Sequence, residues 1–440
     1  MATAPGRAGI AVIRVSGDAA LPVLQRLRCG AAAPQPRRAT LCRLRGRAGD
    51  TLDEGLFLWF PRHNSFTGED VVELHVHGGR AVVAGILEEL AAMPGLRPAE
   101  PGEFTRRAFD NGRLDLTAVE GLADLVAADT PAQRRQALSQ LSGRLAGVYD
   151  DWTRRLTRAL AWLEAEIDFA DEDLPDGIGA ATRAAVDSVR AEMAAHLADG
   201  RRGEIVREGY SIAIVGPPNA GKSSLLNALA QRDAAIVAET AGTTRDVVEV
   251  RLDIGGYAAV VADTAGLRSG ADPVEEEGIR RALARASQAD LVLLVVDASD
   301  PGPAADIGRR LRDAGVAEVM VCANKVDLVD AAGSRAVGDG QAHPLSVRTG
   351  AGMAELLSVL ARRIAGHVGM ESEAPVLSRL RHRLAIEACG EHLLRFASVV
   401  QPDLAAEDVR LAVRELGRIT GRVDVEDLLD VIFRDFCIGK

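Results

Sequence analysis

Residues 216–223 read Gly-Pro-Pro-Asn-Ala-Gly-Lys-Ser, which matches the pattern G-x-x-x-x-G-K-[ST]. The segment follows a strand-like apolar run and precedes a predicted helix, so backbone N–H groups would converge on a phosphate at the helix N-terminus. In such a loop the ammonium of Lys222 reaches the β- and γ-phosphates, and the hydroxyl of Ser223 binds Mg2+. These residues therefore predict a nucleoside triphosphate site.

Two later segments have the composition of loops that sense a γ-phosphate. Residues 241–246 read Ala-Gly-Thr-Thr-Arg-Asp, and the hydroxyl of Thr244 would complete the Mg2+ shell when a γ-phosphate is present. Residues 263–266 read Asp-Thr-Ala-Gly at the end of a predicted strand. There Asp263 can hold the outer shell of the metal, and the N–H of Gly266 can contact the γ-phosphate.

Two further segments predict which base the bound nucleotide carries. Residues 324–327 read Asn-Lys-Val-Asp, and the carboxylate of Asp327 can accept hydrogen bonds from the N1–H and 2-amino group of guanine, a donor pair that adenine lacks. Residues 346–348, Ser-Val-Arg, fit a loop that touches guanine O6 through backbone N–H groups. Four motifs in this order within about 135 residues indicate a guanine-nucleotide site.

The elements that position these motifs alternate in type along the chain. Residues 1–112 mix strand-like runs (10–15, 56–60 and 71–76) with a predicted helix at 81–92, which indicates an α+β domain. Residues 113–208 and 369–440 are predicted to be helical. Between them, residues 209–368 alternate apolar strands (211–215, 258–262, 291–296 and 319–323) with helices, as in a parallel sheet with helices on both faces. The α/β block is thus predicted to be inserted into a discontinuous helical domain.

Composition restricts the class of protein. The 440 residues, 47% of them hydrophobic, suffice for two or three domains and argue against disorder. No apolar run approaches the ~20 residues that cross a bilayer, and no signal pattern opens the chain, so we expect a cytoplasmic protein without a membrane partner. Five scattered cysteines without a C-x-x-C pair fit neither a disulfide framework nor a zinc ribbon. The formal net charge of -11 restricts any nucleic-acid surface to a local arginine patch.

Lysine is scarce in this chain. Of 52 basic residues only Lys222, Lys325 and Lys440 are lysines, and the other 49 are arginines. A site that needs a compact ammonium does not accept a planar guanidinium, so all three lysines are candidates for function. Two of them lie in the nucleotide motifs, and the third ends the chain.

The whole chain resembles the bacterial tRNA uridine-modification GTPases of the MnmE (TrmE) family, with a G domain of the translation-factor class. The resemblance rests on Thr-Ala-Pro-Gly at 3–6, Asn-Ser-Phe-Thr-Gly-Glu-Asp at 64–70, Pro-Gly-Glu-Phe-Thr at 101–105, the nucleotide motifs, and the terminal Cys-Ile-Gly-Lys at 437–440. It implies a homodimer that acts on tRNA in a complex with an FAD-dependent partner of the MnmG (GidA) type. It also implies that C5 of the wobble uridine (position 34) receives a carboxymethylaminomethyl or aminomethyl group.

The cofactors implied by the resemblance are GTP, Mg2+, K+ and 5,10-methylene-tetrahydrofolate or 5-formyl-tetrahydrofolate, with FAD only on the partner. The residues expected to contact GTP are Asn219, Ala220, Gly221, Lys222, Ser223, Ser224, Ala238, Thr243, Thr244, Asp263, Thr264, Ala265, Gly266, Asn324, Lys325, Asp327, Ser346, Val347 and Arg348.

Hydrolysis requires a device other than the glutamine of Ras-like enzymes, because Leu267 occupies that position and cannot orient water. The resemblance implies K+ beside the phosphates, with Asn219 as a side-chain ligand and the loop residues Ala238, Thr240 and Thr243 as further ligands. It implies that Glu275 positions the attacking water. From the residues alone, Asn219 also fits a loop-stabilising amide and Glu275 a solvated carboxylate.

For the N-terminal domain the resemblance implies folate contacts from Arg14, Glu73, Arg113 and Lys440. A carboxylate such as Glu73 can bind the amide-and-amine edge of a pterin in a bidentate way, and arginines suit a polyglutamate tail. Ordinary surface ion pairs are the alternative. His75 and His77 share one face of a strand, but a metal site would need a third ligand.

The two termini raise separate questions. Family members usually have a strand before the Thr-x-Pro-Gly segment, so we expect either a misassigned start or an N-terminal sheet that lacks this edge strand. Cys437 is predicted to act as a nucleophile or proton donor if a nearby cation lowers its pKa, and a small buried hydrophobic residue is the alternative.

Two other functions fit part of the sequence. One is a GTP-switched ribosome or RNA assembly factor that modifies no base, and the other is a folate-dependent transferase with a regulatory G domain. The assembly factor explains neither the N-terminal domain nor the Cys-Ile-Gly-Lys tail.

Overall fold

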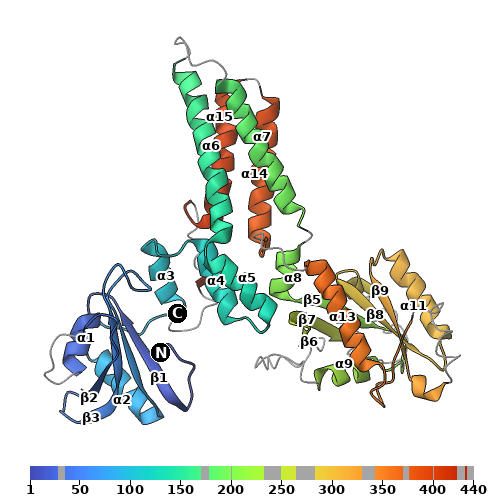
Figure 1. The fold of residues 1–440 in the computed structure, drawn as a ribbon, viewed down its shortest axis with the longest axis horizontal. Coiled ribbons are helices and arrows are strands. Elements are labelled where there is room, and N and C mark those ends of the chain that lie inside the picture. The colour runs from blue at the N-terminus through green and yellow to red at the C-terminus, as the bar shows by residue number, and fades with distance from the viewer. Residues whose placement is uncertain are drawn as a thin grey trace, which may run out of the picture. The chain divides into compact units, whose positions relative to one another are not determined.

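The computed structural model describes residues 1–27, 35–169, 178–199, 201–231, 249–263, 283–329, 342–369, 376–399, 401–423 and 432–433. The chain divides into two compact units, which we describe separately. Figure 1 labels their helices and strands. The first comprises Met1–Ala123, Gln140–Thr182 and Arg395–Lys440, and the second comprises Asp124–Ser139 and Arg183–Leu394. The four domain ranges expected from the sequence stay a prediction.

An antiparallel sheet with the strand order β1-β4-β3-β2 forms the N-terminal part of the first unit. Its elements are β1 (Ala8–Ser16), α1 (Ala20–Leu27), β2 (Thr40–Arg45), β3 (Thr51–Phe60), β4 (Val71–Gly78) and α2 (Arg80–Ala91). Because side chains alternate along a strand, Ile13 and Leu74 point into a core shared with Leu24 of α1 and Ile86 of α2. Arg14 and Glu73 therefore lie on the opposite face.

The strands and the helix predicted in this region are confirmed, whereas α1 and β2 were not predicted. β1 is an edge strand of the sheet. Beside it, the N–H of Ala2 donates to the carbonyl of Val12 at 2.8 Å, and the N–H of Val12 donates to Oγ1 of Thr3 at 3.2 Å.

The helices of the first unit come from both ends of the sequence. They are α3 (Glu103–Asp110), α4 (Leu116–Val126), α6 (Arg144–Asp168) and α15 (Pro402–Thr420). Arg410 of α15 pairs with Glu164 of α6 at 2.9 Å, and Arg422, just after α15, pairs with Asp150 at 2.9 Å. Since the later residue meets the earlier partner, α6 and α15 are antiparallel. The predicted discontinuous helical domain is confirmed.

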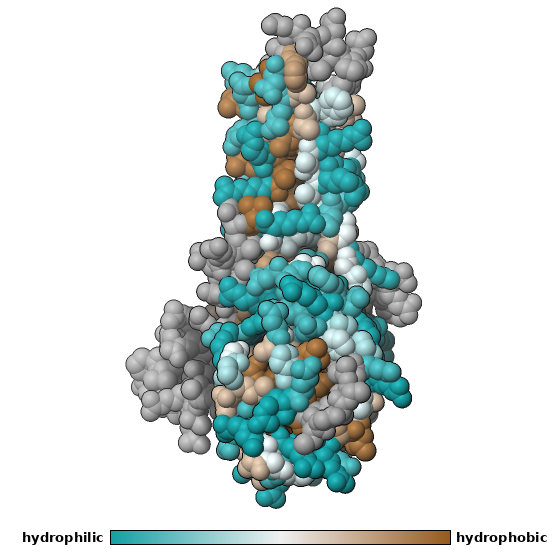
Figure 2. All heavy atoms as spheres, turned by 90° about the vertical axis from the view of Figure 1, so that its left-hand side faces the viewer, coloured by the Kyte–Doolittle hydropathy of each residue, from teal (hydrophilic) through white to brown (hydrophobic). Residues whose placement is uncertain are grey.

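Amphipathic patterning explains this helix pair. Tyr149, Trp152 and Leu156 are buried on one face of α6, as are Val409 and Leu416 on α15. On the face that Figure 2 shows, hydrophobic residues run along the long helices with hydrophilic residues on both sides. Among the described helices, none has the length and apolar character that crossing a bilayer requires.

The second unit contains a six-stranded sheet of order β10-β9-β8-β5-β7-β6. Its strands are β5 (Tyr210–Val215), β6 (Glu249–Ile254), β7 (Tyr257–Asp263), β8 (Leu291–Asp297), β9 (Val319–Asn324) and β10 (His343–Pro344). The helices that cover it are α9 (Lys222–Ala230), α11 (Gly302–Asp313) and α13 (Met353–Val368), with a 3-10 turn at η1 (Val326–Leu328). Leu226 and Leu356 of α9 and α13 pack on one face, and Leu311 of α11 packs on the other, so the predicted two-faced sheet is confirmed.

One strand departs from the predicted parallel sheet. β6 runs antiparallel to β7, and Ile254 pairs directly with Tyr257. Only two residues, Gly255 and Gly256, join the strands, and their φ angles are +65° and +89°. A two-residue loop with positive φ at both positions forms a tight hairpin, which forces antiparallel pairing.

The second unit also contains helices that precede or follow the sheet in the sequence. They are α5 (Pro131–Leu141), α7 (Ile178–Leu197), α8 (Arg202–Glu208) and α14 (Leu380–Ser398), where α5, α7 and α14 extend slightly beyond the unit. Arg383 of α14 pairs with Asp199 and with Glu204 of α8, each at 3.0 Å. Because α8 ends two residues before β5 begins, these ion pairs hold α8 in place next to the start of the first strand of the sheet.

Candidate functional site

Residues 216–221 form a tight loop between β5 and α9. A Cβ at Gly216 would lie 2.3 Å from the carbonyl oxygen of Val295, and a Cβ at Gly221 would lie 2.2 Å from Nδ2 of Asn324. Gly221 also has a φ of +99°, which favours glycine. The loop thus comes close to two neighbouring strands and directs the N-terminal N–H groups of α9 towards one point, as phosphate binding requires.

The predicted groups of this loop contact the loop backbone and the last residue of β7. Nζ of Lys222 donates to the carbonyls of Gly216 and Pro217, each at 2.8 Å, and Oγ of Ser223 donates to Oδ2 of Asp263 at 2.6 Å. Burial lowers the pKa of Lys222, and the nearby charge of Asp263 opposes this effect. The oxygens of Ser223 and Asp263 are hard ligands, so this pair suits Mg2+. Asn219 is exposed in the same loop, with a φ of +60°.

Asn324 connects the phosphate loop to the predicted base-recognition loop. Its side chain is buried, Nδ2 donates to the carbonyl of Ala220 at 2.9 Å, and Oδ1 accepts the N–H of Val347 at 3.1 Å. Both ends of one planar amide are therefore used, and the two loops keep a fixed separation.

Asp327 has the charge state that guanine recognition needs. Oγ of Ser346 donates to its Oδ1 at 2.6 Å, and Nε of the exposed Arg348 lies 3.5 Å from its Oδ2. The hydrogen bond from Ser346, with a smaller contribution from Arg348, lowers the pKa of Asp327. The carboxylate is therefore ionised at neutral pH and can accept two N–H groups of guanine.

Asp297 belongs to this site and was not predicted. Its Oδ2 lies 2.6 Å from Nζ of Lys325, and its Oδ1 accepts both the N–H and the hydroxyl of Ser299. Burial would raise the pKa of Asp297, but the bonds from Lys325 and Ser299 outweigh it and lower the pKa. The sequence held only a partial signal, because Asp297 directly follows the predicted strand 291–296. Its register opposite Asn324 at the end of β9 appears only in the structure.

The N-terminal sheet brings together Arg14 and Glu73, two of the residues predicted to bind folate. Arg14 and Glu73 face each other on β1 and β4, with Nη2 and Oε1 2.7 Å apart. The stem of Arg113 packs against the loop between β3 and β4, since a Cβ at Gly68 would lie 3.4 Å from its Cγ. Nε2 of His75 lies 3.2 Å from Oε2 of Glu73.

Two aromatic rings lie near the guanidinium of Arg14. The guanidinium carbon of Arg14 lies 5.9 Å from the ring centroid of Phe66 and 5.7 Å from that of Phe104. A paired carboxylate, a guanidinium and two rings form a surface that can bind a flat, polar heterocycle.

Several predicted site residues lie outside the described part of the chain: Ala238, Thr240, Thr243, Thr244, Thr264, Ala265, Gly266, Glu275, Cys437 and Lys440. Within the described part, no three potential ligands gather as a metal cluster. His77 pairs instead with Asp53, with Nδ1 and Oδ1 2.8 Å apart.

Models of known protein families match both the N-terminal domain and the rest of the chain. A family model described as GTP-binding protein TrmE N-terminus matches residues 1–113, and one described as MnmE helical domain matches residues 116–437. A tRNA modification GTPase MnmE from Parvibaculum lavamentivorans is 54% identical over 100% of this chain and 99% of that protein. The protein of that name from Paramagnetospirillum magneticum is 54% identical over 100% of this chain and 98% of that protein.

A mitochondrial relative is also similar along the whole chain. The protein named 5-taurinomethyluridine-[tRNA] synthase subunit GTPB3 of Danio rerio is 47% identical over 100% of this chain and 92% of its own length. With the nucleotide loops described above, these matches show that the chain belongs to the MnmE (TrmE) family of tRNA modification GTPases and is a GTP hydrolase.

Proposed function

We propose that this chain is a K+-stimulated GTPase that acts with an FAD-dependent partner of the MnmG (GidA) type on tRNA in the cytoplasm. Together they add a carboxymethylaminomethyl or aminomethyl group to C5 of the wobble uridine. The one-carbon unit comes from 5,10-methylene-tetrahydrofolate. The observation that carries this proposal is that one chain combines a guanine-nucleotide loop set with the Arg14–Glu73 pair, whose guanidinium lies near two aromatic rings.

At the nucleotide site, each described residue has a separate task. Lys222 would turn from the two loop carbonyls to the β- and γ-phosphate oxygens, and Ser223 with Asp263 would hold Mg2+. Asp327 would accept the two N–H groups of guanine. The exposed amide of Asn219 would contribute an oxygen to K+, which supplies positive charge beside the phosphates. We expect Thr244 and Glu275 to order the metal and the attacking water.

At the N-terminal site, Glu73 would bind the amide-and-amine edge of the pterin, and the rings of Phe66 and Phe104 would pack beside it. A Cβ at Gly102 would lie 2.4 Å from the carbonyl oxygen of Phe433, so the chain near its C-terminus lies against the start of α3. Seven residues follow Phe433, and an extended segment of that length reaches up to about 25 Å. This reach supports a contact between Lys440 and the folate.

We infer a homodimer in which GTP binding and hydrolysis close and open the paired G domains. The zebrafish relative is named as a subunit of a synthase, which supports a complex with a second protein. Hydrolysis would then be a conformational step coupled to the chemistry on the uridine.

Reconstitution tests the proposal. The purified chain, its FAD-dependent partner, unmodified tRNA, GTP, K+, Mg2+ and methylene-tetrahydrofolate should together yield a 5-substituted wobble uridine, measured by mass analysis of nucleosides. Omission of the folate or of the chain should leave the uridine unsubstituted. Product formation without folate would contradict the one-carbon assignment. No product in the complete mixture, with altered ribosome profiles in cells that lack the chain, would favour the assembly factor.

A further inference from the structure

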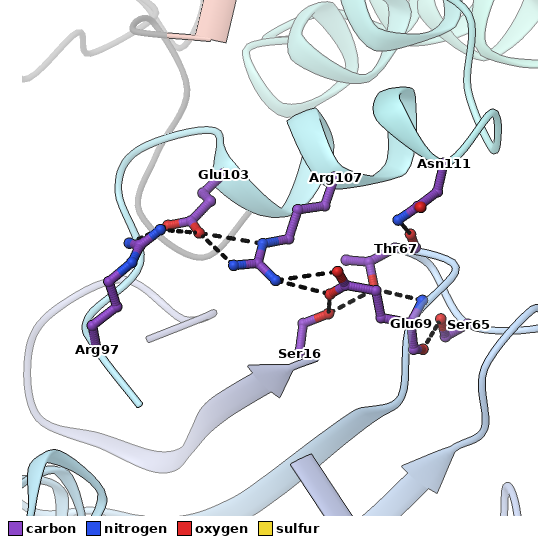
Figure 3. A network of polar contacts seen from close by, with 8 residues as sticks. All are labelled: Ser16, Ser65, Thr67, Glu69, Arg97, Glu103, Arg107 and Asn111. Carbon is purple, nitrogen blue, oxygen red and sulfur yellow. Dashed lines mark hydrogen bonds and ion pairs between the residues drawn. The ribbon is translucent and has the colours of Figure 1, made fainter. Parts of the chain in front are cut away.

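A network of charged side chains surrounds Arg107 on α3 (Figure 3). Its Nη1 lies 3.2 Å and 3.0 Å from the two carboxylate oxygens of Glu69, and its Nη2 and Nε lie 2.8 Å and 3.2 Å from Oε1 of Glu103. Glu103 also pairs with Arg97, with Nη2 and Oε1 2.7 Å apart. Two arginines and two glutamates balance in charge, and the planar guanidinium of Arg107 contacts both carboxylates at once.

The network connects three elements. Glu69 lies in the loop between β3 and β4, and its Oε2 accepts the hydroxyl of Ser16 at the end of β1 at 2.8 Å. Asn111, next to the end of α3, donates from Nδ2 to the carbonyl of Thr67 in the same loop at 2.8 Å. The loop, β1 and α3 are therefore held together, and the Arg107–Glu69 pair is a charged contact between the loop and the helix.

The same loop and helix supply the two rings beside Arg14. Phe66 comes from the loop, three residues before Glu69, and Phe104 comes from α3, three residues before Arg107. Residues three apart on a helix lie on neighbouring positions of its surface, so a shift of Arg107 would move Phe104 with it. The separation of the two rings thus depends on the ion pair between their elements.

We propose that Arg107 is a positioning residue for the one-carbon carrier: by clamping Glu69 to Glu103 it sets the gap between Phe66 and Phe104 and so prepares the Arg14–Glu73 pair for a pterin ring. This inference rests on the proposed folate site. It assigns to Arg107 no contact with the ligand, since its donors are used by the two glutamates.

The test uses the full chain and 5-formyl-tetrahydrofolate, with the dissociation constant measured by titration calorimetry. Arg107→Met keeps the length of the stem and removes the charge, and it should weaken binding about tenfold because the site loses its prepared geometry. Arg107→Lys, which keeps the charge and can contact one carboxylate, should recover part of the loss. Arg43→Met is the matched control, because it breaks the exposed Arg43–Glu54 pair on β2 and β3, towards the opposite edge of the same sheet, and should bind normally.

A double-mutant cycle separates positioning from a general loss of stability. If Arg107 acts through the ring of Phe104, Arg107→Met should weaken binding less in a Phe104→Leu background than in the unaltered chain. Far-UV circular dichroism and the melting temperature, measured on each preparation, report whether the variant is folded. If Arg107→Met does not fold, Glu69→Gln replaces it with the same expected weakening, since it removes the partner charge at nearly constant size.

Equal affinity of Arg107→Met and the unaltered chain would overturn the inference, as would an equal loss in both backgrounds of the cycle. Failure of the unaltered chain to bind the folate would overturn the proposed function itself, and the inference with it.

Discussion

Asn324 and Asp297 are two side chains at the ends of neighbouring strands that set the shape of the nucleotide site. Asn324 connects the phosphate loop to the base-recognition loop, and Asp297 fixes the ammonium of Lys325. The sequence motif predicted Asn324 and Lys325 because their spacing is local. It did not predict Asp297, which lies 28 positions away from Lys325 and meets it only through the register of β8 and β9.

The first prediction concerns Asp297. Asp297→Asn should weaken GDP binding about tenfold, because a charge-assisted hydrogen bond that holds Lys325 contributes roughly 1.5–3 kcal/mol. Fluorescent-nucleotide titration measures the effect. Asp300→Asn, three residues further along the same loop, is the control and should bind GDP normally. Identical affinities of the two variants would show that Lys325 does not depend on its partner.

At the scale of elements, burial decided what the sequence could predict. Strands β5 and β8 are buried on both faces and appear as continuous apolar runs, so they were predicted. The β6–β7 hairpin was signalled by two adjacent glycines between apolar runs, a signal that we did not use. In the network around Arg107, the Glu103–Arg107 pair has the local i,i+4 spacing of a helix, a signal that we did not use. The Arg107–Glu69 pair had no local signal, because its residues lie 38 positions apart and meet only after folding.

A second prediction concerns the contact between α3 and the C-terminal segment. Gly102→Ala should weaken 5-formyl-tetrahydrofolate binding and lower the melting temperature, because the new Cβ would lie 2.4 Å from the carbonyl of Phe433. Gly95→Ala is the matched control. Gly95 has a φ of +80° and open space around it. The variant's free energy of unfolding should therefore fall only by the roughly 1 kcal/mol that an alanine at positive φ costs. Equal folate affinities of the two variants would contradict a role for the C-terminal segment.

A third prediction concerns the anchoring of α8 by Glu204. Burial would raise the pKa of Glu204, but hydrogen bonds from Arg201 and Arg383 outweigh it and lower the pKa from its ordinary value of 4.5. Because the pKa of Glu204 is lower in the folded state, the ion pairs stabilise the folded chain above pH 4.5. This stabilisation is lost as the pH falls through the folded-state pKa.

Glu204→Gln should therefore lower the free energy of unfolding by roughly 2 kcal/mol at pH 7, and the difference from the unaltered chain should shrink as pH falls below the ordinary value. Denaturant unfolding at several pH values measures it. Glu208→Gln is the control on the same helix, where the side chain is 59% exposed and pairs only with its neighbour Arg207 among the pairs described. A pH-independent difference would show that charge does not hold α8.

At the scale of the whole molecule, helices from distant parts of the sequence pair with each other in the first unit. α6 and α15 are antiparallel partners although the entire six-stranded sheet lies between them in the sequence. The change from helical to alternating periodicity predicted this insertion. Periodicity could not predict the antiparallel pairing itself, because the ion pairs that show it join residues more than 240 positions apart.

A fourth prediction concerns the monovalent cation. With Na+ in place of K+, GTP turnover should fall by at least about tenfold, since Leu267 offers no group to stabilise the developing charge. Asn219→Ala should lose this dependence and keep nucleotide binding. Asn227→Ala, on the exposed surface of α9, is the control and should respond to K+ normally. Undiminished turnover of the unaltered chain in Na+ would exclude the cation mechanism.

The most direct measurement is mass analysis of wobble uridines in tRNA from cells that lack this chain and carry either the unaltered gene or its Lys222→Arg variant. A guanidinium should not replace the compact ammonium at the phosphates, so the variant should hydrolyse no GTP. We predict that the 5-substituted wobble uridine disappears without the chain, returns with the unaltered gene and stays absent with Lys222→Arg. Unchanged wobble uridines in cells without the chain would contradict a role in tRNA modification.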